Sequence, residues 1–192
     1  MKFILLVFVT LITTWAQAQS ALSGYLNKSS TGQWLLVLND KEFSLSARKT
    51  VSEQLNKLDA GDIISGTGIV NNATDSIELL SIDYVGLKKI LGLWFSREGL
   101  IEFKNFTTLN FYPRQKASGD YLVSKAYLVD YQQQYRYSMT PSNGREWTLY
   151  LTDKKATSLG TLIVDGNIAV LKIYDSNTGD LVKALRLSRL QK

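Results

Sequence analysis

The chain has 192 residues with a formal net charge of +5, two prolines, no cysteine and no histidine. Without cysteine or histidine it cannot build a disulfide framework, a Cys–His or Ser-His-Asp nucleophile, or the usual zinc centre. It also lacks a phosphate-binding glycine loop and a hydrolase serine motif. We therefore expect a protein that is not an enzyme and has no cofactor and no metal site.

The first eighteen residues predict an export signal. Lys2 supplies the positive charge, residues 3–15 are mostly apolar, and Ala16-Gln17-Ala18 is typical of a cleavage site. The apolar stretch is shorter than the roughly 20 residues that span a bilayer. We expect a mature chain that begins near Gln19, is periplasmic or secreted, and has no transmembrane segment.

Charge is distributed unevenly after the signal. From Gln19 to Gly86 there are five basic and eight acidic residues, whereas from Leu87 to Lys192 there are sixteen basic and nine acidic residues. No Lys/Arg run concentrates the positive charge, and charges scattered over strand faces are usually just solvated. Because single-strand binding needs a basic groove with exposed aromatics, the acidic first half argues against a nucleic-acid partner.

The first half shows five strand-like segments and one helix. Thr50-x-x-Glu53 predicts a capping box at the start of the helix, and Val51, Leu55 and Leu58 form its apolar stripe. The continuous apolar run after Gln33 predicts a strand covered on both faces. The expected strands are Leu22–Lys28, Gln33–Asn39, Glu42–Ala47, Asp62–Val70 and Ser76–Val85.

This element order, with Gly24 inside the first strand and Gly61-Asp62 opening the fourth, resembles the OB-fold. The resemblance implies a five-stranded barrel whose helix lies between the third and fourth strands. OB-folds often bind oligonucleotides or oligosaccharides across their second and third strands, which here contain Trp34 and Phe43. The apolar neighbours of Trp34 favour packing in the core over a stacking platform.

The second half predicts strands throughout. Asn143-Gly144, Asp165-Gly166 and Thr178-Gly179-Asp180 are hairpin signals, and regularly spaced strands favour an antiparallel barrel or sandwich. The Asp175–Asp180 segment partly fits a calcium loop, but we interpret it as a turn. The expected strands are Gly92–Ser96, Leu100–Lys104, Thr108–Tyr112, Tyr121–Tyr131, Gln134–Met139, Glu146–Thr152, Ser158–Val164, Ile168–Tyr174 and Leu181–Leu190.

Gly92-Leu93-Trp94 resembles the Gly-x-Trp of small lipocalin-type barrels. In that family the Trp closes the barrel floor and an Arg from the last strand covers it. The resemblance implies a floor made by Gly92, Trp94 and Arg189, with Arg186 as the alternative arginine. A guanidinium over an indole contributes about 0.5–2 kcal/mol. The alternative interpretation is that Trp94 is an ordinary core residue of another barrel.

An aromatic run in the second half is the best candidate for function. Alternation places Tyr135, Tyr137 and Met139 on one strand face, with Trp147 and Leu149 on the face of a neighbouring strand. Cross-strand packing explains this arrangement, but tyrosine hydroxyls need partners, so a ligand cavity remains the alternative. The candidate ligand-binding residues are Tyr127, Tyr135, Tyr137, Met139, Trp147 and Leu149.

We predict an all-β protein made of two small antiparallel β-barrel modules, the first with one short helix. The expected organisation is a signal peptide at 1–18, an OB-fold-like module at 19–86 and a lipocalin-like barrel at 87–192. The expected function is binding of a small apolar or amphipathic ligand in the second barrel. The alternative is an interaction module that docks another envelope protein and takes no small ligand.

Overall fold

The structure is a computed structural model, and it describes residues 19–113, 132–142, 144–154 and 156–190. The predicted signal peptide, the strand predicted at Tyr121–Tyr131 and the candidate residue Tyr127 lie outside these residues. In the described part of the chain, no helix is long and apolar enough to cross a membrane.

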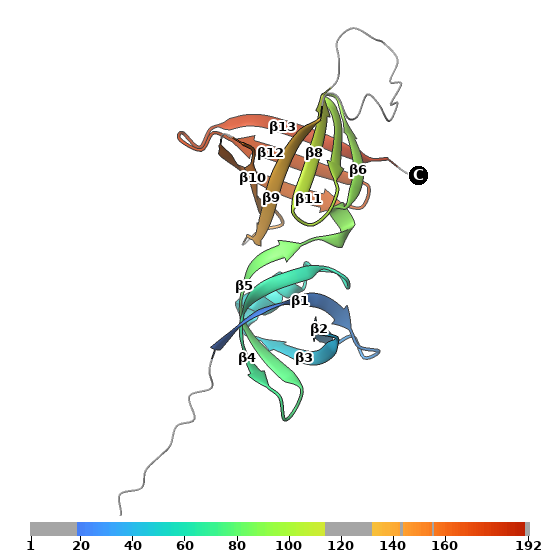
Figure 1. Cartoon of the computed structure of the whole chain (residues 1–192), viewed down its shortest axis with the longest axis vertical. Helices are drawn as coiled ribbons and strands as arrows, with labels where there is room; N and C mark the ends of the chain where they lie inside the picture. Colours follow the sequence, from blue (N-terminus) through green and yellow to red (C-terminus); the bar gives the residue numbers. More distant parts are fainter. Residues whose placement is uncertain (1–18, 114–131, 143, 155, 191–192) are drawn as a thin grey trace, which may run out of the picture.

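The described residues form strands with one short α-helix and one 3₁₀ turn, so the all-β prediction is confirmed (Figure 1). In chain order the elements are β1 (Gln19–Lys28), β2 (Trp34–Leu38), β3 (Lys41–Ala47), α1 (Lys49–Leu55), β4 (Ile63–Asn71), β5 (Ser76–Gly86), η1 (Lys88–Ile90), β6 (Gly92–Ser96), β7 (Gly99–Phe103), β8 (Thr108–Pro113), β9 (Gln133–Pro141), β10 (Trp147–Thr152), β11 (Thr157–Asp165), β12 (Ile168–Tyr174) and β13 (Leu181–Arg189).

The first five strands close into a barrel in the order β1-β2-β3-β5-β4. The β3–β5 pair is parallel, the other pairs are antiparallel, and α1 lies between β3 and β4 in the chain. This architecture is compatible with an OB-like barrel. The strand register shifts beside Gly66, where an added Cβ would lie only 2.0 Å from the Ser81 carbonyl oxygen. Glycine therefore permits the close approach that lets β4 bend.

Two local predictions for this barrel are wrong. Helix α1 begins two residues earlier than the capping box requires: Arg48 is the N-cap in place of Thr50, Thr50 lies inside the helix, and no side chain caps the end. Val51 and Leu55 are buried as expected, so packing of this face rather than capping positions the helix. In β2 only Leu36 is fully buried, because one face of a small barrel strand is left towards solvent.

The remaining eight strands form a second closed barrel in which every strand is antiparallel to its neighbours. Each strand pairs with the next one in the chain, and β13 returns to pair with β6. Roughly eight strands enclose an interior that side chains can just fill or that can hold one small ligand. Whether this interior is filled or hollow therefore decides what the barrel can do.

The two barrels lie end to end, with β5 leading from the first into the second (Figure 1). Side chains of the first barrel reach across the junction. Lys57 Nζ donates to the carbonyls of Ser142 at 2.8 Å and Gly144 at 2.6 Å, and the Tyr84 hydroxyl donates to the Phe106 carbonyl at 2.7 Å. The buried hydrophobic residues of both barrels form one continuous cluster. One end of the second barrel is therefore covered by the first.

Candidate ligand-binding site

The second barrel is sealed at the end nearest the first barrel. Trp94 on β6 is 0 % exposed, and its indole Nε1 donates a 2.7 Å hydrogen bond to the Ile90 carbonyl at the end of η1. Gly92, two residues before Trp94, has φ = +116°, a conformation that an L side chain rarely adopts. The 3₁₀ turn and the glycine together bring the chain across the barrel end and direct the indole inward.

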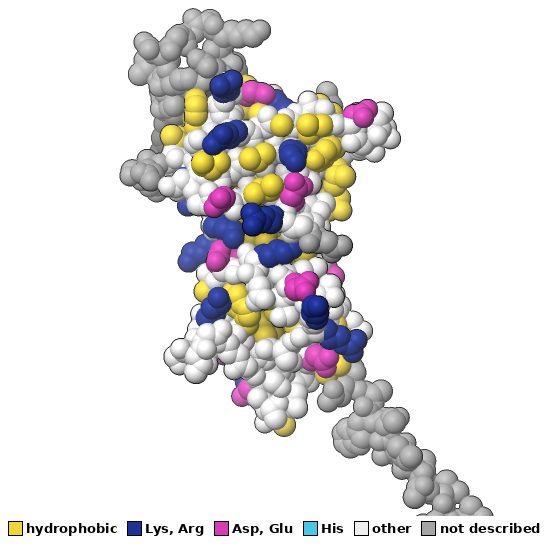
Figure 2. Space-filling model, turned by 180° about the vertical axis from the view of Figure 1, so that it is seen from behind, with side chains coloured by type: hydrophobic (Ala, Val, Ile, Leu, Met, Phe, Trp, Pro, Cys, Tyr) yellow, Lys and Arg dark blue, Asp and Glu magenta, His cyan; other side chains and the backbone are white. Residues whose placement is uncertain are grey.

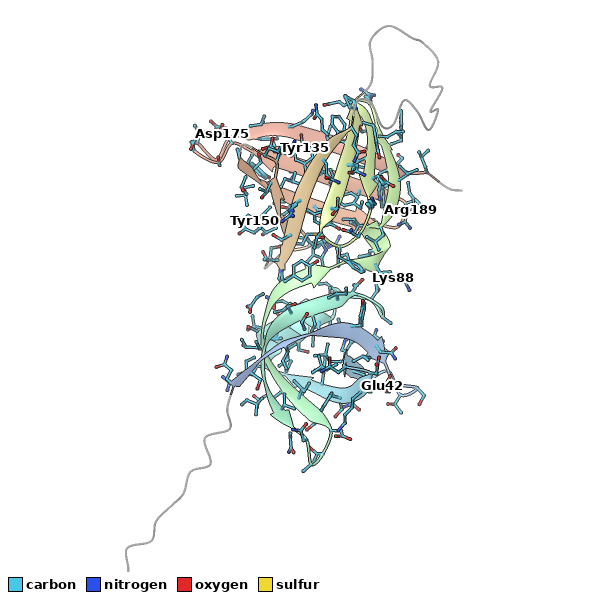
Figure 3. The ribbon with its side chains drawn as sticks, in the orientation of Figure 1. Glu42, Lys88, Tyr135, Tyr150, Asp175 and Arg189 are labelled. Carbon is cyan, nitrogen blue, oxygen red and sulfur yellow. The ribbon has the colours of Figure 1, made fainter. Side chains whose placement is uncertain are left out.

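Arg189 on β13 covers this indole. Its guanidinium carbon lies 5.1 Å from the centroid of the Trp94 ring, and Nη2 donates to the carbonyls of Lys89 at 2.7 Å and Leu91 at 2.8 Å. Arg186, the alternative considered from the sequence, is exposed on the outer face of the same strand. Figure 3 shows Arg189 on the side of the barrel nearer Lys88. The arginine therefore joins the last strand, the first strand and the inter-barrel turn.

Above this floor the barrel interior is filled by four of the candidate residues. Tyr137 and Met139 on β9 and Trp147 and Leu149 on β10 are all buried, and Met139 lies directly opposite Leu149. The Tyr137 ring packs edge-on against Phe103, with 5.4 Å between the ring centroids. The predicted shared inward face is present, and its residues pack against one another.

The Tyr137 hydroxyl has its own partner within this packed layer. It donates a 2.7 Å hydrogen bond to the Asn105 carbonyl, and burial raises the pKa of Tyr137, so the phenol stays neutral. In the described residues, no buried side-chain nitrogen or oxygen lacks a hydrogen-bond partner. The Tyr137 hydroxyl therefore needs no water-filled cavity or ligand as a hydrogen-bond partner.

A pocket of about 240 Å³ opens into the other part of the barrel interior. Of the candidate residues in the described chain, Tyr135 alone lines it, and Figure 3 shows this residue towards the end of the barrel away from the first module. Its hydroxyl donates to Gln133 Oε1 at 3.2 Å. The apolar wall consists of Ile101, Leu109, Phe111, Leu151, Leu171, Ile173 and Leu185.

The rim of this pocket is polar and includes one lysine. Lys183 forms an ion pair with Glu98, and its Nζ also lies 5.7 Å from the centroid of the Phe111 ring. Gln133, Asp153 and Ser158 add further polar groups to the lining. An apolar wall with convergent polar groups at its rim is the usual composition of a small-molecule site. The arrangement suits a ligand with an apolar body and a polar end.

The carboxylates that could take part in chemistry already have hydrogen-bond or ion-pair partners. Glu98 pairs with Lys183, whereas Glu102 accepts hydrogen bonds from Asn110 and Tyr112 at 2.8 and 2.9 Å. Asp175 accepts backbone N–H bonds from Asn177 and Thr178, which lower the pKa of its carboxyl. No group of three metal-ligating side chains occurs among the described residues. The two glutamates therefore hold separate contacts, and Asp175 organises a turn.

Most of the pocket wall was not among the residues selected from the sequence. Ile101, Phe111, Leu171 and Ile173 alternate with residues of the other strand face, as inward-facing residues of a barrel must. On β7 and β8 this other face is also buried, at Leu100, Asn110 and Tyr112. The same alternation marks the packed residues near Trp94, so it predicts which side chains point inward and not how deep they lie. Comparisons of the chain with protein-family models, with curated proteins and with solved structures found no match.

Proposed function

We propose that the second barrel is lipocalin-like and binds a small apolar or amphipathic ligand through the pocket opposite the Trp94 floor. The supporting observation is the division of the interior into two parts. Side chains fill the part nearest the first barrel, whereas a lined space of about 240 Å³ remains beside Tyr135. A barrel with one end plugged and the other hollow has one route for a ligand.

The pocket dimensions and chemistry limit the ligand class. Typical ligand sites measure about 300–1,000 Å³, so a pocket at or below this range suits a short chain or the inserted end of a longer one. Lys183 at the rim would attract a carboxylate or another anionic end group, provided that Glu98 shares or releases it. A short-chain fatty acid or a related amphiphile combines these properties.

The role that we propose for the whole chain is that of an exported carrier. The predicted signal at 1–18 favours a periplasmic or secreted carrier, and the lack of histidine and cysteine favours binding over catalysis. The OB-like first barrel seals one end of the second through the contacts of Lys57 and Tyr84. We assign it a supporting role at the sealed end.

Isothermal titration calorimetry with decanoate tests the proposal. Decanoate should bind the wild-type chain saturably, with one molecule per chain. Ile173→Trp adds bulk to a half-buried wall position and should weaken binding at least tenfold. Leu159→Trp, on the outer face of β11, is the matched control and should change the affinity less than twofold. Absence of saturable binding, or equal loss in both variants, would remove the proposal.

A further inference from the structure

The closing seam of the second barrel is short. β13 pairs with β12 along almost its whole length, from Ser188 opposite Ile168 to Leu181 opposite Tyr174. On its other side β13 pairs with β6 only where Ser188 faces Phe95 and Arg189 faces Trp94. Residues 181–187 thus have no strand partner on that side within the described chain. Most of one edge of β13 is open.

The direction of the backbone groups along this edge follows from two hydrogen bonds. The Leu190 N–H donates to the Leu93 carbonyl on the β6 side, whereas the Arg189 N–H donates to the Asn167 carbonyl on the β12 side. Backbone direction alternates along a strand, so the N–H and C=O groups of Ala184 and Arg186 point to the β6 side, as do those of Leu190. An unpaired strand edge is a template for adding another strand.

A groove of about 430 Å³ runs along the outside of this open edge. The turn residues Arg97 and Glu98 form one side, and Ala184 and Arg186 form the other. Glu98 is already paired with Lys183. The two arginines are exposed, and neither forms an ion pair with any described residue. The groove therefore presents two guanidinium groups that fit a carboxylate.

Apolar side chains continue the groove toward the start of β13. The strand register shifts there, since Lys183 faces Ile173 while Leu181 faces Tyr174, which leaves Val182 as an extra residue. Leu181 and Val182 consequently both face solvent, at 54 % and 66 % exposure. Figure 2 shows hydrophobic side chains interspersed with Lys and Arg on the outer face of the second barrel. The open edge thus combines a basic part with an apolar part.

We propose that this edge of β13 binds an extended, acidic peptide segment of another protein, which adds as a short strand. The backbone of Ala184 and Arg186 would pair with the segment, and its carboxylate would meet Arg97 and Arg186. An apolar side chain of the same segment, two to four residues from this carboxylate, would cover Val182. The groove shares Leu185 and the Lys183–Glu98 ion pair with the interior pocket. Strand addition uses the backbone edge of β13, so this inference does not depend on the ligand proposed for the interior.

Charge complementarity favours such a segment over a second copy of the same chain. A two-fold pairing of β13 with itself would bring the arginines of both grooves together, and the residues that line the groove add no carboxylate apart from the Glu98 already paired with Lys183. Like charges brought together in this way oppose association. A peptide rich in Glu and β-branched residues meets both the basic and the apolar part of the groove.

The test uses the mature chain and a fluorescein-labelled octapeptide in which Val and Thr alternate around two glutamates. Fluorescence anisotropy should show saturable binding that Arg186→Glu weakens at least tenfold. Arg136→Glu makes the same charge change at an exposed residue of β9, which is paired on both sides, and should change the affinity less than twofold. A peptide with lysines in place of the glutamates should bind at least tenfold more weakly.

A second readout separates strand addition from simple charge attraction. When the acidic peptide binds, amide hydrogen exchange at Ala184 and Arg186 should slow at least tenfold. Unchanged exchange at both amides, equal effects of the two arginine variants, or no saturable binding by the wild type would each overturn the proposal. Sedimentation analysis completes the test, because a dimer that Arg186→Glu dissociates would assign the edge to a second copy.

Discussion

Replacement of Arg189 by methionine should destabilise the second barrel more than any comparable change on the outer face of β13. The variant keeps an unbranched apolar stem against Trp94 but removes the guanidinium. It therefore removes the two hydrogen bonds to the Lys89 and Leu91 carbonyls as well as the contact above the ring. Arg186→Met is the matched control, since Arg186 is an exposed arginine of the same strand.

The expected loss follows from these contacts. A hydrogen bond from a charged donor contributes about 1.5–3 kcal/mol, and a cation–π contact about 0.5–2 kcal/mol. Arg189 is half-buried and water can partly replace it, so the low ends of these ranges apply. The loss should be about 2–4 kcal/mol, against less than about 0.5 kcal/mol for Arg186→Met.

Urea unfolding followed by tryptophan fluorescence measures both variants. Trp94→Phe, alone and combined with Arg189→Met, gives a double-mutant cycle whose coupling energy should be about 0.5–2 kcal/mol. If Arg189→Met costs no more than Arg186→Met, or if the coupling is zero, then the floor does not depend on the arginine. The reasoning about the sealed end would then be refuted.

Two further predictions concern buried polar groups. Tyr137→Phe loses the bond to Asn105 and should cost about 0.5–1.5 kcal/mol at neutral pH. Since burial raises the folded-state pKa of Tyr137, the unfolded chain loses this proton first, and wild-type stability should fall as the pH rises above about 10. Urea titrations of both proteins across that range should show a smaller fall for Tyr137→Phe. Asp62→Asn should cost about 1–3 kcal/mol in the same assay, because the buried Asp62 carboxylate accepts the N–H groups of Asp59 and Lys88 at 2.8 and 2.6 Å, and an amide can accept only one of them well.

The strand pattern could be predicted from the sequence because it depends on local alternation. The segment Gly92–Ser96 and the strand Ile168–Tyr174 have the predicted bounds, and glycine–polar pairs mark several of the hairpins between strands. The helix start was mispredicted because Thr50-x-x-Glu53 matches a capping pattern while packing of Val51 and Leu55 sets the true boundary. Closure of each barrel could not be derived from local alternation, because it depends on pairings between residues far apart in the chain.

The site was harder to predict for a geometric reason. Tyr135 and Tyr137 are two residues apart on one strand face, yet one lines the pocket and the other lies in the packed layer. Their depth depends on strand tilt and on which side chains from other strands reach the same level. Lys183 likewise gains its position at the rim from its pairing with Glu98, which no local pattern indicates.

The central claim is that a natural small molecule occupies the pocket beside Tyr135. The most direct measurement is native mass spectrometry of the full mature chain purified from the cells that produce it, together with the Ile173→Trp and Leu159→Trp variants. The account predicts one bound small molecule per chain in the wild type and in Leu159→Trp, and none in Ile173→Trp. A bare chain in all three samples, or the same adduct in Ile173→Trp, would contradict it.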